Sequence, residues 1–212
     1  MANLYQAVLK QVKRKRHDAR RPRNPKAVSR ADSAVTSSHS SRRATPGPPG
    51  LGAGKCNVAV AAGAFVPVGF EVPAPLVTDR FRLEPLGPRH NEADHAAWTS
   101  SISHIRATPG FAGRDWPPLE GMSLEDNLSD LRKHAEDFAT ARGFTYSVVD
   151  RDDPGLVIGC VYIYPSASPV YEATVRSWVT ADRADLDGPL AAALAAWLEA
   201  RWPWDRIDYA GR

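Results

Sequence analysis

The sequence predicts one folded α/β (α+β) domain, from about residue 65 to residue 212, in which helices cover a mixed sheet. Downstream of residue 65, apolar residues recur with strand and helix periods in the order strand, two helices, three strands, helix, strand. Residues 1–63 instead hold 13 Lys/Arg against two Asp, whereas the rest of the chain holds 14 against 22 Asp/Glu. A chain of 212 residues would give two full domains thin cores, so we expect one.

Residues 1–64 are predicted to be a disordered basic extension. Their basic side chains repel one another, and the following Ser-rich and Pro/Gly-rich stretches have too little apolar surface to offset the entropy of ordering. A helix is expected at most for residues 2–15. A solvated tail is the favoured interpretation, and nucleic-acid binding through the basic arm 10–30 is the alternative.

Cysteine, histidine and hydropathy patterns limit the class of protein. The two cysteines, Cys56 and Cys160, cannot form a disulfide framework, which favours a reducing compartment. The chain has no apolar run long enough to span a bilayer and no secretory signal, so the sequence predicts a soluble cytoplasmic protein without membrane contact. His90, His95 and His134 lack metal-ligand spacing, so no metal is predicted.

The first strand and helix follow from two periodicities. Residues 76–86 alternate apolar and polar side chains, the period of a half-buried strand. Residues 90–105 place Trp98, Ile102 and Ile105 at helical spacing before a Thr-Pro-Gly stop. A strand and a first helix are therefore expected here.

A second helix is predicted to begin at Ser123. Ser123 and Asp126 have capping-box spacing, and Gly143 suits the end of the helix. Its expected apolar stripe consists of Leu124, Leu128, Leu131, Ala135 and Phe138. One side of this helix should therefore pack on the sheet.

Three strands, a helix and a last strand complete the expected order. Residues 144–150 and 156–164 form a hairpin across an Asp-Asp-Pro-Gly turn, and the second of these is apolar on both faces, as in a central strand. The remaining elements are strand 173–179, helix 189–202 with Leu190, Leu194, Trp197 and Leu198 buried, and strand 206–209.

This order and four local motifs resemble the GCN5-related N-acetyltransferase (GNAT) family. The motifs are residues 76–86, Ile105–Phe111, Ile158–Pro165 and Val175–Val179, and they are most similar to a group of actinobacterial GNAT-like proteins. The resemblance covers residues 76–212. It implies a mixed, mainly antiparallel sheet flanked by helices, and an N-acetyltransferase activity with acetyl-CoA as co-substrate.

The resemblance also implies where acetyl-CoA would bind. In the family the pantetheine pairs with backbone of the fourth strand, here Trp178, Val179 and Thr180. The diphosphate lies on a Q/R-x-x-G-x-G/A loop, of which this chain keeps Arg183 and Gly188. Leu186 replaces the first glycine of the loop, and three aspartates, Asp182, Asp185 and Asp187, crowd the expected anion site. Asp187 also suits the helix N-cap before Pro189.

Candidate catalytic side chains lie around the central strands. Acyl transfer to an amine needs a base, for which Glu172 is the candidate, and an acid, for which Tyr164 is the candidate. Tyr162 is placed in the acceptor pocket, and His104 with Arg106 suits a carboxylate-bearing acceptor. Each has a structural alternative: a solvated strand-end Glu, core packing of the tyrosines, and a capping or surface role for His104 and Arg106.

Two functions therefore stay open at the level of the sequence. One is an N-acetyltransferase acting on an amine of a small molecule or protein, and the other is a non-catalytic GNAT-like binding protein that has lost acetyl-CoA binding. The sequence ends at Arg212, before the further helix and strands usual in the family. A fifth strand at the sheet edge would allow strand exchange with a second copy, so a homodimer is one alternative.

Overall fold

The computed structural model describes residues 64–209. The predicted disorder of residues 1–64, the helix at 2–15, the basic arm 10–30 and Cys56 thus concern a part of the chain that lies, apart from Ala64, outside the described residues.

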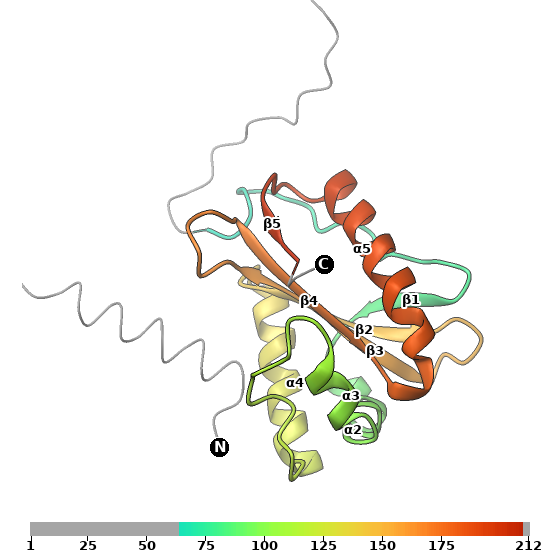
Figure 1. The fold of residues 1–212 in the computed structure, drawn as a ribbon. Helices are drawn as coiled ribbons and strands as arrows, with labels where there is room; N and C mark the ends of the chain where they lie inside the picture. The colour runs from blue at the N-terminus through green and yellow to red at the C-terminus, as the bar shows by residue number, and fades with distance from the viewer. Residues whose placement is uncertain (1–63, 210–212) are drawn as a thin grey trace, which may run out of the picture. The chain divides into compact units, whose positions relative to one another are not determined.

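One five-stranded sheet forms the centre of the domain (Figure 1). Its strands are β1 (Phe81–Pro85), β2 (Phe144–Asp150), β3 (Val157–Pro165), β4 (Ala173–Val179) and β5 (Ile207–Asp208). They lie in the order β1-β2-β3-β4-β5, the first four antiparallel and β5 parallel to β4. The predicted mixed, mainly antiparallel sheet is confirmed.

Within residues 64–209, helices occupy three stretches: residues 88–107, 124–139 and 181–201. The α-helices are α2 (Asn91–Thr99), α3 (Ile102–Ala107), α4 (Leu124–Ala139) and α5 (Asp187–Arg201), and the 3-10 helices are η1 (Pro88–His90) and η2 (Ala181–Leu186). Among residues 64–209, none of these helices combines the length and apolar character needed to cross a bilayer. The described residues also contain no group of three or more His, Cys, Asp or Glu side chains suited to a metal ion.

The two faces of the sheet have different cores. On one face, α5 places Leu190, Leu194 and Trp197 against strand residues such as Tyr146 and Val175. On the other face, residues of α2, α3 and α4 pack with strand side chains that include Cys160 and Trp178. All four residues predicted to be buried in α5, which include Leu198, are buried, because the central strands are covered on both faces.

The predicted helix 90–105 is wrong as one helix, since α2 and α3 are separate. At the break, Ser100 Oγ donates to the Ala97 carbonyl at 2.9 Å and Ser101 Oγ accepts the N–H of Ala181 at 3.0 Å. Serine side chains that bond to backbone compete with the helical pattern. The break therefore serves to tie α2 and α3 to the chain that follows β4.

The first strand is also shorter than predicted. Thr78 Oγ1 accepts the N–H groups of Arg80 and Phe81 at 3.2 and 3.0 Å, and Val77 bridges back to Arg82. This turn folds residues 76–80 onto the start of β1, so only Phe81–Pro85 joins the sheet. Side-chain turns of this kind were not visible in the alternating pattern.

The cap of α4 is confirmed and its apolar stripe is partly wrong. Ser123 Oγ accepts the N–H of Asp126 at 3.1 Å, as the capping pattern predicts. Leu131 is buried against the sheet, but Leu124, in the first turn, is 46% exposed. The first turn of α4 therefore extends beyond the sheet that the rest of the helix covers.

Candidate functional site

The opening between β4 and β5 begins two residues into β4. The parallel pairing consists of Ala173 with Ile207 and Thr174 with Asp208. No strand among residues 64–209 pairs with this edge of β4 beyond Thr174. An exposed strand edge offers a row of N–H and C=O groups to an extended ligand.

Three residues of β4 direct their backbone groups into this opening. Thr180 donates its N–H to the Ile158 carbonyl on β3 at 2.9 Å. Because successive residues of a strand bond to opposite sides, Val175, Ser177 and Val179 face away from β3. Of the backbone predicted to bind pantetheine, Val179 faces the opening, whereas the N–H of Thr180 is already used.

The loop expected to hold a diphosphate has few free backbone donors. Ala181 donates to Ser101 Oγ, the N–H groups of Arg183 and Asp187 close turns of η2, and Pro189 has no N–H. In the first turn of α5 this leaves Gly188, where the surface is open and a Cβ would meet no atom within 4 Å. The loop therefore does not fit a diphosphate held on a row of backbone N–H groups.

Charges around this loop are partly paired. Arg80 bonds to Asp185 and lowers the pKa of that carboxyl, and Arg183 Nη2 lies 3.2 Å from Asp150 Oδ2. Thr180 Oγ1 and Arg183 Nε are buried without a hydrogen-bond partner among the described residues. Side chains, more than backbone, would have to bind any phosphate here. The predicted N-cap role of Asp187 is wrong: η2 runs directly into α5, and Leu186 occupies the cap position.

Glu172, the predicted base, joins the start of β4 to the segment before β5. Its Oε2 accepts the N–H groups of Asp205 and Arg206, both at 3.0 Å, and its own N–H donates to the Arg206 carbonyl at 2.8 Å. Its Oε1 has no hydrogen bond with the described residues. The side chain is exposed at the closed end of the β4–β5 opening.

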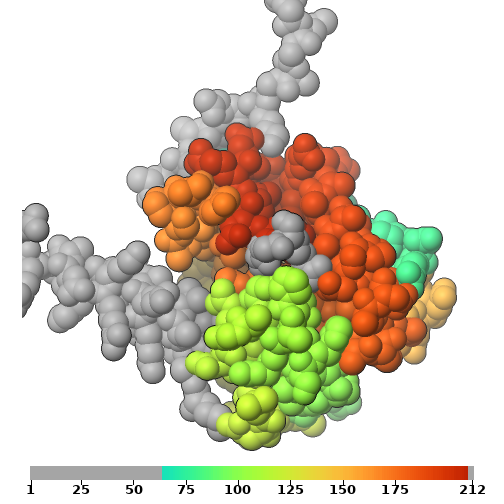
Figure 2. Space-filling model, viewed as in Figure 1, coloured from blue at the N-terminus to red at the C-terminus, as the bar shows by residue number. Residues whose placement is uncertain are grey.

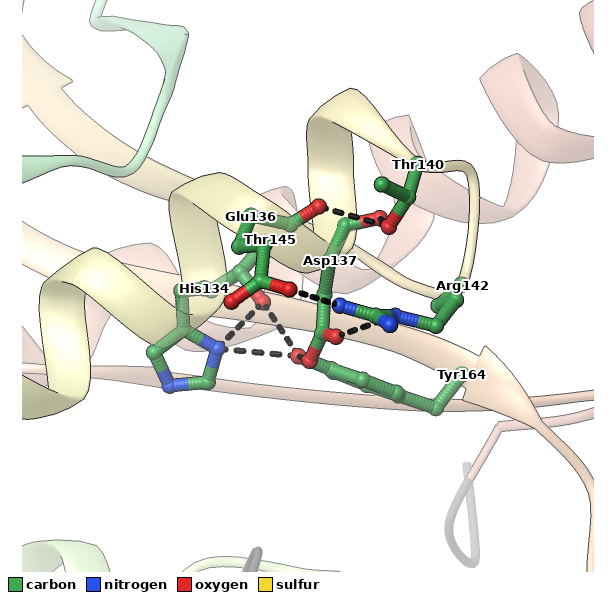
Figure 3. Close-up of polar contacts among 7 residues, drawn as sticks. All are labelled: His134, Glu136, Asp137, Thr140, Arg142, Thr145 and Tyr164. Carbon is green, nitrogen blue, oxygen red and sulfur yellow. Dashed lines mark hydrogen bonds and ion pairs between the residues drawn. The ribbon is translucent and has the colours of Figure 1, made fainter.

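Tyr164, the predicted acid, belongs to a polar network between α4 and the sheet (Figure 3). Its hydroxyl lies 2.9 Å from His134 Nδ1 and 3.3 Å from Asp137 Oδ2, and Thr145 Oγ1 lies 3.1 Å from the same His134 nitrogen. Arg142 Nε donates to Asp137 Oδ1 at 3.0 Å. Burial lowers the pKa of His134 to about 4, so the ring is neutral near pH 7 and Nδ1 can accept. The network joins α4 to β2 and β3.

Tyr162 lies in an aromatic cluster on the face that α2 and α3 cover. Its hydroxyl accepts from Trp178 Nε1 at 3.4 Å, and its ring centroid is 6.2 Å from Phe111 and 5.9 Å from Trp116. Burial raises the pKa of Tyr162, which keeps the phenol protonated. The predicted common face of Tyr162 and Cys160 on β3 is confirmed.

His104 and Arg106 both lie on α3, two residues apart. Arg106 Nη1 donates to the Pro117 carbonyl at 2.8 Å and borders a cavity of about 650 Å³ between the loop 115–122 and α4. His104 is not among the residues that line this cavity, and its Nε2 is buried without a partner among the described residues. The joint binding of a carboxylate by His104 and Arg106 stays a prediction.

Sequence reasoning missed two side chains at the opening, Tyr209 and Arg176. The Tyr209 hydroxyl, just after β5, lies 2.7 Å from Ser177 Oγ on β4. Arg176 is the β4 residue between Val175 and Ser177, and its Nε is buried. The alternation of side chains along β4 would have assigned Arg176 and Ser177 to opposite faces of the sheet. Only the pairing of β4 with β5 brings Tyr209 to Ser177.

The element order, the sheet order, the single parallel pair β4–β5 and its early separation are those that the family resemblance implies. The domain has a GNAT-like fold. In the space-filling view, α5 (orange-red) and the region of α3 (green) are both visible from one side of the GNAT-like domain, although they cover opposite faces of the sheet (Figure 2).

Comparisons with known proteins add structural likeness only. A search with protein-family models and a search of curated protein sequences gave no match. The domain is similar to a ribosomal-protein-S5-alanine acetyltransferase from Vibrio fischeri, with 12% identity over 60% of this chain and 68% of that chain and a TM-score of 0.47.

Two further solved structures are similar over a comparable share of this chain. The microcin C7 self-immunity acetyltransferase MccE, in complex with acetyl-CoA and AMP, is 13% identical over 58% of this chain and 63% of its own, with a TM-score of 0.44. An acetyltransferase from Agrobacterium tumefaciens is 17% identical over 61% and 68%, with a TM-score of 0.39. At these values the likenesses carry no argument about activity.

Proposed function

We propose that the GNAT-like domain is an N-acetyltransferase that moves an acetyl group from acetyl-CoA to an amine of a small molecule or protein. The observation that carries the proposal is the β4 edge from Val175 to Val179, which is left without a strand partner beside a tyrosine hydroxyl. An extended thioester could pair with this edge as an added strand does. In this cleft its carbonyl would lie close to Ser177 and Tyr209.

The side chains at the opening suggest a division of roles. The amine nitrogen attacks the thioester carbonyl carbon and the C–S bond breaks. Tyr209 donates its hydroxyl proton to the leaving thiolate, and the proton lost by the amine passes through water to Glu172. Tyr164 stays a candidate acid, but it lies on β3, away from the β4–β5 opening, and its hydroxyl is engaged with His134 and Asp137 of α4.

Acceptor and assembly remain predictions. The neighbour from Vibrio fischeri is described as acting on an alanine of ribosomal protein S5, and we extend to this chain only the class of amine acceptor. Cytoplasmic location, a homodimer and nucleic-acid contact through the basic arm rest on the sequence.

One observation favours a second function, a binding protein that keeps the fold without catalysis. Apart from the Gly188 N–H, the backbone donors at Ala181, Arg183, Asp187 and Pro189 are engaged or missing, and Asp182 and Asp187 add negative charge beside the expected diphosphate position. Like charges oppose the binding of an anion. A domain built this way would bind acetyl-CoA weakly or not at all.

Isothermal titration of the full chain with acetyl-CoA separates the two functions. Saturable binding in the micromolar range supports the acetyltransferase, and no heat at millimolar ligand refutes it in favour of the binding protein. If acetyl-CoA binds, thiol release in the presence of amines tests catalysis. Tyr209→Phe is then expected to lower kcat by about 100-fold. Tyr171→Phe, at an exposed tyrosine before β4, is the matched control and is expected to leave the rate unchanged.

A further inference from the structure

Arg176 occupies a special position on β4. It lies directly opposite Tyr162 on β3 and two residues from Trp178, so its side chain is on the face that carries the aromatic cluster. Its neighbours along the strand, Val175 and Ser177, direct their backbone groups into the β4–β5 opening. Arg176 therefore lies next to the strand edge at which the proposed thioester would pair, with its side chain on the opposite face of the sheet from those of Ser177 and Tyr209.

The guanidinium of Arg176 makes no direct ion pair among the described residues, although the carboxylate of Asp208 lies near enough to influence it. Its Nε is buried without a hydrogen-bond partner, and no hydrogen bond or salt bridge joins it to residues 64–209. Several other arginines in this part of the chain form ion pairs, for example Arg183 with Asp150 and Arg142 with Asp137. A partly buried charge without a partner is unfavourable unless a ligand compensates it.

The surroundings of Arg176 keep it charged and add a second cation. Burial lowers its pKa to about 10, Arg114 lowers it in the same direction, and Asp208 on β5 opposes them. At pH 7 the group stays protonated. Arg114 is fixed on the loop after α3, where its Nε donates to the Gly110 carbonyl at 2.6 Å. The two guanidinium charges thus lie close enough to repel each other.

An aromatic wall closes the region on one side. The rings of Phe111 and Trp116 lie 5.6 Å apart, and Trp116 lies 6.0 Å from Trp178. Apolar walls exclude water and strengthen ion pairs formed beside them. The site combines two guanidinium groups, of which Arg114 is held by the Gly110 carbonyl, with planar apolar walls and an open strand edge.

We propose that Arg176 and Arg114 bind a carboxylate group of a reactant at the β4–β5 opening. Guanidinium groups bind carboxylates through parallel N–H donors, and one carboxylate would offset the repulsion between the two cations. The nearby Asp208 disfavours a more highly charged phosphate. The carboxylate belongs either to the acyl chain, as in a succinyl thioester, or to an amino-acid acceptor. The identification of it as a reactant rests on the proposed function.

Carboxylate binding can be tested without any acyl transfer. In the full chain labelled with ¹⁵N, the Arg176 Nε–H resonance is assigned by its loss in Arg176→Lys and followed during titration with sodium succinate. We expect a saturable shift that sodium chloride at equal ionic strength does not produce. An Arg176 resonance that succinate leaves unmoved, or moves no further than chloride does, overturns the proposal.

The source of the carboxylate follows from a second comparison. If it belongs to the acyl chain, succinyl-CoA should bind at least about tenfold more tightly than acetyl-CoA, and Arg176→Gln and Arg176→Lys should both abolish the difference, because lysine cannot form the paired donors. If it belongs to the acceptor, the two thioesters should bind alike. Arg176→Gln should then raise KM for glutamate as acceptor but not for glutamine α-amide, which lacks the carboxylates.

Two outcomes separate this inference from the proposed function. If neither thioester binds while succinate still shifts Arg176, the acetyltransferase function fails and the carboxylate site stands. If thioesters bind and transfer occurs, but Arg176→Gln changes neither comparison, the assignment to a reactant is wrong. Arg132→Gln, at an exposed arginine of α4, is the control for loss of one positive charge and should behave as the wild type.

Discussion

Replacing Asp94 by Asn is expected to stabilise the domain at neutral pH. Asp94 is buried on α2, where its Oδ2 accepts from Asn127 Nδ2 at 3.2 Å, and Asn127 Oδ1 in turn accepts from Trp98 Nε1 at 3.0 Å. Burial is the main cause that raises the pKa of Asp94 to about 6, opposed by the Asn127 hydrogen bond and the charge of His95. The carboxylate is therefore held in an environment that favours its neutral form.

The magnitude follows from the two pKa values. Raising the pKa from 3.8 in the unfolded chain to about 6 in the fold corresponds to about 3 kcal/mol. The folded state binds the extra proton, so this contribution to stability is complete below pH 3.8 and is lost as the pH rises through about 6. Asparagine has the same shape and never ionises. Asp94→Asn should therefore match the wild type near pH 4 and exceed it by about 3 kcal/mol at pH 8.

Urea unfolding of both proteins between pH 4 and pH 8 measures this difference as the free energy of unfolding extrapolated to water. The same Asp→Asn change at exposed Asp152 should give a nearly constant difference over the range. If the Asp94→Asn difference stays constant from pH 4 to pH 8, the carboxyl does not titrate as its burial requires. A difference that grows as the pH falls would also refute the reasoning, because the sign would be reversed.

Four further predictions concern packing, capping and the candidate site. Gly159→Ala should destabilise the fold by about 3 kcal/mol in urea unfolding, because the added Cβ would lie 2.3 Å from the Trp178 carbonyl oxygen. Its control is Gly188→Ala, whose Cβ would meet no atom within 4 Å and which should stabilise α5 by about 0.5 kcal/mol. Ser123→Ala should cost about 1 kcal/mol through loss of the α4 cap, and equal stability would contradict that role. By calorimetry, acetyl-pantetheine should bind within about tenfold of acetyl-CoA, since the loop before α5 has few free donors; a ratio above about 1,000 would show strong phosphate recognition. Phosphate titration should broaden or shift the Gly188 amide more than the Ala181 amide, which already donates to Ser101.

Strands and the long helices could be predicted because burial leaves a period in the sequence. Residues 144–150 and 173–179 became strands with those bounds, and the apolar positions of α5 are buried as predicted. The Ser123 cap was readable because it acts over three residues of the chain. Local signals of this kind need no knowledge of distant segments.

Side chains that bond across the fold could not be predicted in the same way. The break between α2 and α3 depends on Ser101, whose partner Ala181 is eighty residues away along the chain. The engaged donors of the loop 181–189 likewise depend on η2, which the degenerate loop pattern did not indicate. Both features bear directly on the proposed co-substrate.

By itself, the sequence determined the order of elements, the two covered faces of the sheet and the family resemblance, because periodicity and capping are local. Only the tertiary structure decided that β5 leaves β4 after two pairs, that Tyr209 reaches Ser177, and that Arg176 lies half-buried with its Nε unbonded among the described residues. These features arise where strands distant in the sequence meet. Their geometry depends on pairing and packing that no single segment encodes.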